Sequence, residues 1–258
     1  MFPVNRHYNL YIVSKAAGNL ASEASRTYLS FLWWLLDPIL SMIVYYLVFG
    51  MLLQRGTEDF VAFLLIGVLT WHWFAQAVTN SMGAMQNAAP LISKHRFPKI
   101  LLPSVTVLTV TIKFLIAFSL LQVFLLIYGI QPSVHIWAVL PLLLLQFLLV
   151  SACAYLSCLL TTFIPDFKFI IPNLMRFGLF LSGVFYSIDQ LPEQYQRYFD
   201  FNPMAVLLTS YRDALMYHQW PDIEKLLPIL AFAALLYVCM VVLYRRLGDT
   251  IPRILMQA

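Results

Sequence analysis

Six stretches of mostly apolar residues set the strongest limit on what this chain can fold into. They cover residues 29–53, 60–82, 103–129, 136–164, 169–187 and 226–244. A transmembrane helix needs about 20 mostly apolar residues, because the hydrocarbon core of a bilayer is about 30 Å thick. Backbone polar groups must also be satisfied inside that core, which favours helices. The stretches therefore predict an all-α integral membrane protein with six transmembrane helices.

The composition supports a membrane protein. Of the 258 residues, 61% are hydrophobic and 11% are charged, whereas soluble domains carry about 25% charged residues. A soluble fold of this size cannot bury so much apolar surface, so lipid must cover it. Membrane lipid is therefore a predicted partner, and we expect no nucleic-acid partner.

The residue pattern of the N-terminal segment, residues 1–28, predicts a cytoplasmic amphipathic helix. Ala16, Leu20 and Ala24 fall on one helical stripe, and polar side chains fall on the opposite stripe. This pattern is typical of a helix that lies on the membrane surface. The alternative is a lead-in that faces solvent and only anchors the first span. The remainder, residues 29–258, reads as one transmembrane domain.

A long connector, residues 188–225, separates the fifth and sixth predicted spans. Its apolar part, residues 201–217, is broken by Pro203 and interrupted by Arg212 and Asp213. That part is too short and too charged for a seventh span. We expect re-entrant or interfacial helices here, with protein around their backbone groups.

The distribution of basic residues predicts the orientation. With the N-terminus inside, ten Lys and Arg residues fall in inner segments and four in outer ones. The inner ten are Arg6, Lys15, Arg26, Lys94, Arg96, Lys99, Lys168, Arg245, Arg246 and Arg253, and the outer four are Arg55, Arg197, Arg212 and Lys225. Because cytoplasmic loops are enriched in basic residues, both termini are predicted to be cytoplasmic and the connector external.

Motifs of catalysis are missing from the sequence. It contains no G-x-x-x-x-G-K-[ST] phosphate-binding loop, no H-E-x-x-H and no C-x-x-C. The histidines are scattered, the aspartates do not pair at a catalytic spacing, and no metal site is indicated. A chain of many spans without a catalytic set is most simply a conduit or a scaffold.

The cytoplasmic loop between the second and third spans is unusual in mixing cations with apolar residues. Three basic residues and a histidine fall within residues 94–99. The orientation rule alone explains the cations. It does not explain the apolar Leu91 and Phe97 among them, or the stiffening by Pro98. An amphipathic helix over residues 86–96, ended by Phe97-Pro98, would present an apolar and cationic surface to a cytoplasmic partner.

Three short motifs resemble those of ABC-2 type permeases that export polysaccharides. The loop reads LISKHRFPKILLP over residues 91–103, with Leu-Ile, basic residues, Phe-Pro and a later Pro. Residues 29–38 read LSFLWWLLDP, in which Ser30 replaces the usual Gly. Residues 201–203 read FNP and are followed by Tyr211-Arg212. The three motifs occur in the family's order, and the resemblance covers nearly the whole chain.

The resemblance implies a homodimeric permease, not an enzyme, in the cytoplasmic (inner) membrane. It implies two copies of a separate P-loop ATPase, which bind the ATP and Mg that this chain does not. It also implies export of a lipid-linked glycan such as O-antigen, teichoic acid or capsule. The residues expected to contact the ATPase are Ser93, Lys94, His95, Arg96, Phe97, Pro98 and Lys99, and those of the external segment are Asn202, Pro203, Tyr211 and Arg212.

Two stripes of side chains are candidates for a glycan channel. They comprise Trp34, Asp37, Ser41, Tyr45 and Phe49 in the first span, and Asn173, Arg176, Phe177 and Phe180 in the fifth. Aromatic rings suit the C–H faces of sugars, and a cation suits a pyrophosphate-linked lipid. Charges within spans usually face a partner or a cavity. The alternatives are packing against lipid or other helices, and structural pairing or snorkelling for Asp37 and Lys113.

Two other functions remain open from the sequence. A permease of the same fold could export a small hydrophobic molecule. A membrane enzyme that modifies glycans would need His, Asp or Glu side chains that converge on one face, and no such set is found.

Overall fold

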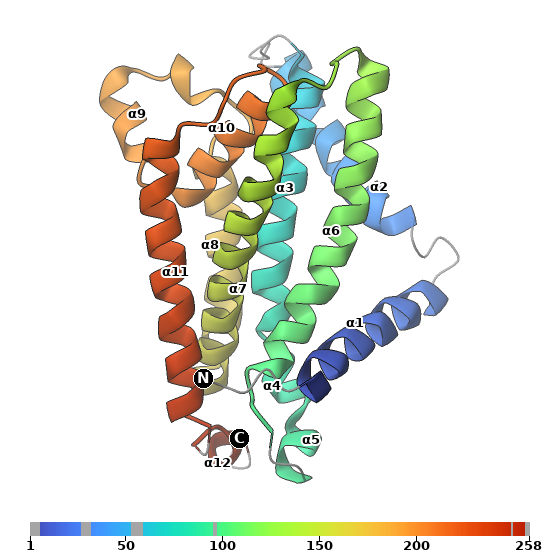
Figure 1. Cartoon of the computed structure of the whole chain (residues 1–258), viewed down its shortest axis with the longest axis vertical. Helices are drawn as coiled ribbons and strands as arrows, with labels where there is room; N and C mark the ends of the chain where they lie inside the picture. Colours follow the sequence, from blue (N-terminus) through green and yellow to red (C-terminus); the bar gives the residue numbers. More distant parts are fainter. Residues whose placement is uncertain (1–5, 27–31, 53–58, 95–96, 249, 256–258) are drawn as a thin grey trace.

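The computed structural model describes residues 6–26, 32–52, 59–94, 97–248 and 250–255. Within these ranges every regular element is a helix, so the predicted all-α class is confirmed (Figure 1). The elements are α1 (Arg6–Arg26), α2 (Leu32–Tyr45), the π-helix η1 (Tyr46–Leu52), α3 (Phe60–Ser81), α4 (Ala84–Asn87), α5 (Ala89–Lys94), α6 (Leu101–Tyr128), the 3₁₀-helix η2 (Val134–Ala138), α7 (Val139–Phe163), α8 (Phe167–Leu181), the 3₁₀-helix η3 (Ile188–Gln190), α9 (Glu193–Phe199), α10 (Pro203–Leu215), α11 (Ile223–Arg246) and α12 (Thr250–Leu255).

Among the described residues, four helical segments are long and apolar enough to cross a membrane. They are α3, α6, α7 together with η2, and α11, and they coincide with the predicted spans 60–82, 103–129, 136–164 and 226–244. Helix α3 lies at the centre and contacts α2, α6, α7, α8 and α10. In the most apolar 18-residue stretch of α3, 78% of the residues are buried. In the corresponding stretch of α11, 17% are buried. The bundle is thus built around α3, and α11 lies at its periphery.

The other two predicted spans differ from single straight helices. Residues 29–31 and 53 lie outside the described residues, and the rest of the first span is α2 continued by η1. The helix within the predicted fifth span, α8, has 15 residues, fewer than the roughly 20 that a crossing needs. It ends at Leu181, and the chain turns at Gly183 with a φ of +69°. The count of six spans therefore stays a prediction.

Polar side chains join α7 to α3. Gln146, Ser157 and Thr161 on α7 donate hydrogen bonds of 2.7 to 3.0 Å to backbone carbonyls along α3 and at its C-cap. Such bonds between helices stabilise packing in lipid, where apolar surface alone gives no driving force for association. They hold α7 against α3, and α8 contacts both of these helices.

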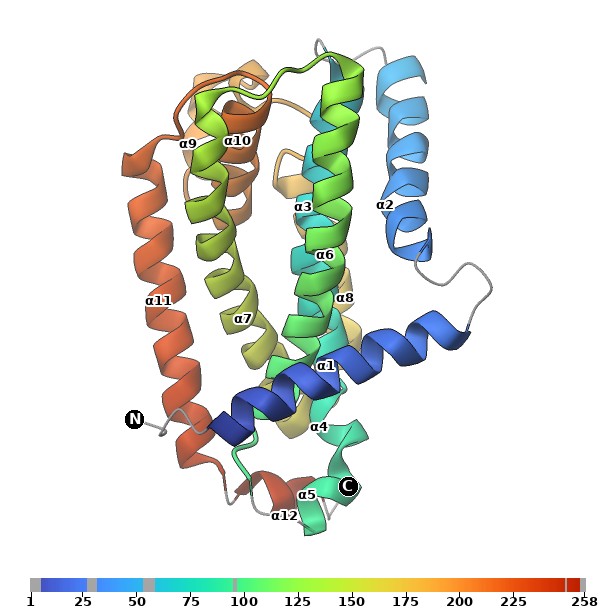
Figure 2. The same cartoon turned by 45° about the vertical axis from the view of Figure 1, so that its right-hand side comes forward.

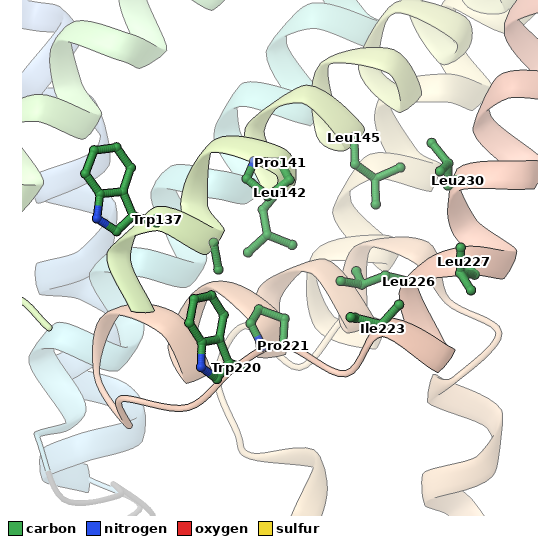
Figure 3. A pocket seen from close by; sticks show the side chains of 11 residues that line it. Trp137, Pro141, Leu142, Leu145, Trp220, Pro221, Ile223, Leu226, Leu227 and Leu230 are labelled. Carbon is green, nitrogen blue, oxygen red and sulfur yellow. The ribbon is translucent and has the colours of Figure 1, made fainter. Parts of the chain in front are cut away.

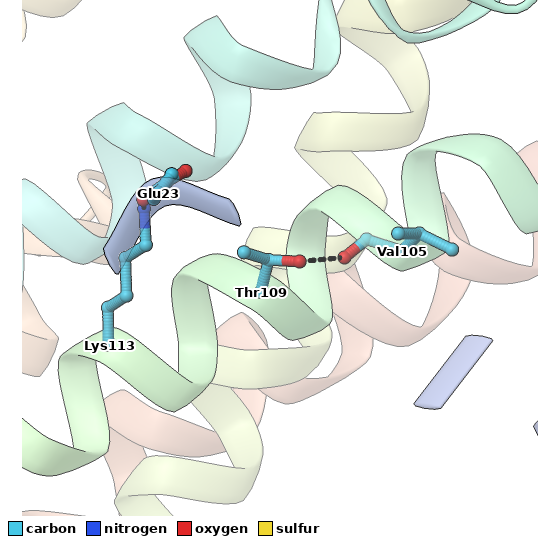
Figure 4. A network of polar contacts seen from close by, with 4 residues as sticks. All are labelled: Glu23, Val105, Thr109 and Lys113. Atoms are coloured by element: carbon cyan, nitrogen blue, oxygen red, sulfur yellow. Dashed lines mark hydrogen bonds and ion pairs between the residues drawn. The ribbon is translucent and has the colours of Figure 1, made fainter. Parts of the chain in front are cut away.

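Helix α1 lies obliquely across α6, near the end of the bundle that carries α4, α5 and α12 (Figure 2). Ala16 of α1 is buried. An ion pair joins Glu23 of α1 to Lys113 of α6 (Figure 4). Thr109, one turn earlier on α6, instead bonds the carbonyl of Val105 in its own helix, at 2.8 Å. Lys113 is therefore paired structurally, one of the two roles expected for it from the sequence.

Candidate functional site

Residues 91–103 form the segment that we call the basic loop. Its described residues lie at the end of the bundle that carries α12, opposite to α9 and α10 (Figure 1). Where one helix was predicted over residues 86–96, the structure has two short helices, α4 and α5, separated at Ala88. His95 and Arg96 lie outside the described residues, as do the side chains of Ser93 and Lys94. The single amphipathic helix is therefore corrected to two short helices.

The described residues of this loop are anchored rather than extended into solvent. Phe97 and Pro98 are half-buried, and Lys99 is buried with its Nζ 4.4 Å from the centre of the Phe97 ring. A cation over an aromatic face is a favourable arrangement at a partly desolvated site. Ile92 of α5 is also buried, and α5 contacts α12. Lys99 and Phe97 thus brace the loop, whereas Leu91 remains exposed on it.

The predicted stripe of the first span lies on α2 and η1. The side chains of Trp34, Asp37 and Phe49 lie outside the described residues. Ser41 and Tyr45 are half-buried. The α-helical register ends at Tyr45, where the wider π-helical turn begins. The stripe inferred from α-helical spacing therefore holds only as far as Tyr45.

The predicted stripe of the fifth span lies on the open face of α8. Asn173, Arg176, Phe177 and Phe180 are all exposed, and Ile171 is the helix's one fully buried residue. Within the part of the chain that the structure describes, Arg176 makes no hydrogen bond or ion pair, while Asn173 donates to the carbonyl of Phe169 at 2.8 Å. A face of cation and aromatic rings is thus presented to whatever surrounds α8.

Phe185 brings the ends of the two stripes together. This buried ring lies with its centroid 4.5 Å from that of Tyr45 and 5.1 Å from that of Phe180. Sequence reasoning missed Phe185, because the residue lies in the irregular segment after α8, where no helical spacing applies. The two stripes therefore converge within one chain.

Close packing places α8 directly on α3. A Cβ atom built on Gly178 would lie 2.7 Å from the Trp71 ring, a distance that real Cβ atoms do not show. The missing side chain at Gly178 thus makes room for the Trp71 ring of α3, as small residues permit close packing between membrane helices. This contact fixes which face of α8 is left open.

Asn202 and Pro203 form the start of α10. The Asn202 Oδ1 atom accepts from the backbone N–H groups of Met204 and Ala205 at 3.1 and 3.3 Å. Its Nδ2 donates to the carbonyl of Leu181 at 3.0 Å, at the end of α8. Pro203 occupies the first turn, where its missing N–H is not needed. The Asn-Pro motif therefore caps α10 and ties it to α8.

Arg212 is buried and supports the turn that follows α8. Its Nη1 donates to the carbonyl of Gly183 at 2.8 Å, and its Nη2 to the carbonyl of Val184 at 3.0 Å. The guanidinium carbon also lies 3.4 Å from the centre of the Phe63 ring of α3. Neighbouring Tyr211 is fully buried. The Tyr-Arg motif thus stabilises the fold, and Arg212 is not open to a substrate.

An acidic cavity lies between α10 and the segments that carry η3, α9 and the start of α11. Four aspartates and one lysine line its volume of about 110 Å³: Asp189, Asp200, Asp213, Asp222 and Lys225. Lys225 pairs with Asp200 at 2.9 Å. Burial, together with the nearby Asp189 carboxylate, raises the pKa of Asp213 to about 6. Among the described residues, no group of three or more His, Cys, Asp or Glu side chains is arranged to hold a metal.

The sequence is similar to a family of transporters and to several named export proteins. The family described as ABC-2 type transporter matches residues 19–216. The chain is 29% identical over 231 residues to the O-antigen export system permease protein RfbA of Myxococcus xanthus, which covers 89% of each chain. It is 26% identical over 189 residues to RfbA of Klebsiella pneumoniae, 73% of each chain. It is 24% identical over 194 residues to the polysialic acid transport protein KpsM of Escherichia coli, 73% of this chain and 74% of that one.

Proposed function

Since this chain belongs to the ABC-2 type transporter family, we propose that it is the permease subunit of an ATP-driven exporter of a lipid-linked polysaccharide, with O-antigen as the first candidate. The similarity to an O-antigen export permease over 89% of both chains carries the proposal. A further relative named for polysialic acid transport is also a polysaccharide transporter by its name. The shared class of cargo is therefore a polysaccharide rather than a small hydrophobic molecule.

The energy for export comes from a separate P-loop ATPase, two copies of which work with two copies of this chain. The sequence contains no phosphate-binding loop of its own, so ATP and Mg are bound by the partner. The basic loop around α5 is the proposed contact with the ATPase. Its support by Phe97 and Lys99 favours a rigid contact, which can transmit movement to α3 and α6.

The open face of α8 is the proposed wall of the glycan path. Phe177 and Phe180 offer aromatic surfaces over which sugar C–H faces can slide, and Arg176 offers a cation for the pyrophosphate of a lipid carrier. A second copy of the chain opposite this face would enclose the path. The alternative is that the same face packs against lipid or against the second copy without contacting glycan.

We propose that the protein lies in the cytoplasmic membrane and that both of its termini are in the cytoplasm. The excess of basic residues in the inner segments supports it. Helices α1 and α12 at one end of the bundle, with α9 and α10 at the other, fit the same topology (Figure 1). The lipid-linked glycan would then move from the cytoplasmic side towards α9 and α10.

Deletion of the gene in its native host tests the proposal. The expected result is loss of polysaccharide from the cell surface, with lipid-linked glycan accumulating inside the cell. Expression of the wild-type chain should restore the surface glycan. A deletion strain with normal surface polysaccharide would exclude this function, provided that the host carries no second permease gene of the same family.

A further inference from the structure

An apolar groove of about 480 Å³ lies between α7 and the start of α11, at the end of the bundle that carries α10 (Figure 3). Its floor is made of buried side chains such as Leu142 and Leu145, and its rim of exposed ones such as Leu227 and Leu230. The groove is separate from the loop at α5 and from the open face of α8. On a peripheral helix of a membrane protein, such a hollow faces lipid.

Two tryptophans bound the groove at one end, and leucines line the other (Figure 3). Trp137 and Trp220 are 72% and 60% exposed, although they belong to segments far apart in the sequence. His135 holds Trp220 edge-on at 4.9 Å between ring centroids, and Ser133 holds His135 through a 3.0 Å hydrogen bond. Tryptophan is enriched at the level of lipid headgroups, where its ring is apolar and its N–H meets polar groups.

The dimensions of the groove suit one lipid tail. From Ile223 to Leu230 the groove follows α11 for about 10 Å, at 1.5 Å per residue. That depth lies within one leaflet, since half of the hydrocarbon core is about 15 Å thick. Nearly all lining atoms are apolar, so a headgroup must stay outside, beside the tryptophans. We propose that the groove binds an acyl chain of a phospholipid from the leaflet on the α10 side.

The charges around the mouth of the groove select the headgroup. Asp222 and Glu224 flank Ile223 in the first turn of α11. The neighbouring acidic cavity contributes four aspartates against one lysine, and that lysine, Lys225, is already paired with Asp200. Carboxylates attract a cation, accept hydrogen bonds from the N–H groups of a primary ammonium, which a choline headgroup lacks, and repel a second anionic group. The occupant is therefore a zwitterionic phospholipid with an ethanolamine headgroup, and not an anionic phospholipid or a pyrophosphate-linked carrier.

Native mass spectrometry of the protein purified in mild detergent tests the proposal. The wild-type protein should retain phosphatidylethanolamine. Leu227→Trp fills the groove, and Leu235→Trp places the same ring on a position of α11 that is 71% exposed and outside the groove. The first variant should retain about tenfold less phosphatidylethanolamine, which corresponds to about 1.4 kcal/mol of binding free energy. The second should match the wild type.

A second pair of substitutions tests the headgroup. Asp222→Asn keeps a side chain that can cap α11, and combined with Glu224→Gln it removes the two flanking charges. This variant should retain lipid but lose the preference for ethanolamine over glycerol headgroups. Equal retention by the wild type and Leu227→Trp would overturn the site. Retention of an anionic or polyisoprenyl-linked lipid by the wild type, or an unchanged preference in the double variant, would overturn the identity of the occupant. A monodisperse elution profile of each variant controls for folding.

Discussion

Arg212 is a charged residue whose surroundings explain its presence in an apolar protein. Its guanidinium group bonds the carbonyls of Gly183 and Val184, which lie in a turn and have no helical partners. Unsatisfied carbonyls inside a membrane protein are costly, so the arginine stabilises the turn by replacing the missing donors. The same contact requires a small residue at position 67 of α3. A Cβ atom there would lie 2.6 Å from Arg212 Nη2 and 3.3 Å from the Val184 carbonyl.

We therefore expect Gly67→Ala to lower the free energy of unfolding by about 1–3 kcal/mol, as overpacking of a tight core does. Thermal unfolding of the protein in detergent measures the change. Gly18→Ala is the matched control, since a Cβ atom there meets no atom within 4 Å and alanine favours a helix. Equal melting temperatures for the two variants would show that the Arg212 contact does not constrain α3.

Asp213 gives the protein a predictable dependence on pH. The pKa of Asp213, about 6, exceeds the ordinary value of 3.8, so the folded state binds protons more tightly than the unfolded state. Proton binding by Asp213 therefore contributes to the free energy of unfolding below about pH 4. This contribution is lost as the pH rises through about 6. Asp213→Asn should therefore stabilise the protein at pH 8 by about 1 kcal/mol after solvent screening. At pH 4 this advantage should be gone.

Unfolding curves of Asp213→Asn and the wild type across this pH range provide the measurement. Asp166→Asn, an exposed aspartate at the opposite end of the bundle, is the control. A pH-independent difference between Asp213→Asn and the wild type would show that Asp213 does not titrate differently on folding.

At the scale of elements, the contact of α1 with α6 combines an ion pair with apolar packing. Glu23 is half-exposed and Lys113 mostly buried, and their pairing fixes where α1 crosses α6. Reversal of either charge should destabilise this crossing by about 1 kcal/mol, and the double reversal Glu23→Lys with Lys113→Glu should recover most of the loss. A double-mutant cycle from thermal unfolding measures the coupling. Additive effects of the two substitutions would mean that the pair does not stabilise α1.

The sequence predicted those elements that depend on local composition. Long apolar runs define α3, α6, α7 and α11, because the thickness of a bilayer sets the length of a crossing helix. The end of α8 at Leu181 could not be predicted in the same way. It depends on bonds from Arg212 and Asn202, which lie far along the chain. The π-helix after Tyr45 likewise has no signal in α-helical spacing.

The candidate site was predictable to a similar extent. Spacing placed Arg176, Phe177 and Phe180 on one face of α8, and the structure leaves that face exposed. The role of Tyr211 and Arg212 was not predictable, because their burial results from packing against other helices: Arg212 lies over Phe63 of α3, and Tyr211 lies beside Phe118 of α6. Phe185 was missed since it joins two stripes through a turn. The sequence pattern thus predicted most of the helices, but it did not predict the contacts between them.

At the scale of the whole molecule, substitutions on the exposed face of α8 can test export without changing the amount of folded protein. Phe177 is 67% exposed, so Phe177→Ala should leave the amount of folded permease unchanged. If this face lines the glycan path, surface glycan per folded permease should fall severalfold. Leu235→Ala on the peripheral face of α11 is the matched control. Unchanged export in Phe177→Ala would assign the face of α8 to lipid or to packing.

The most direct test of the proposed function is movement of the glycan itself. The permease and its ATPase would be reconstituted together in liposomes with a lipid-linked polysaccharide, and a glycosidase that cannot cross the membrane would be added outside. With the ATPase sites outside, ATP should make the glycan progressively resistant to the enzyme as it enters the lumen. An ATPase variant without its phosphate-binding lysine should give no protection. ATP hydrolysis by the intact complex with no protection of the glycan would contradict polysaccharide export by this chain.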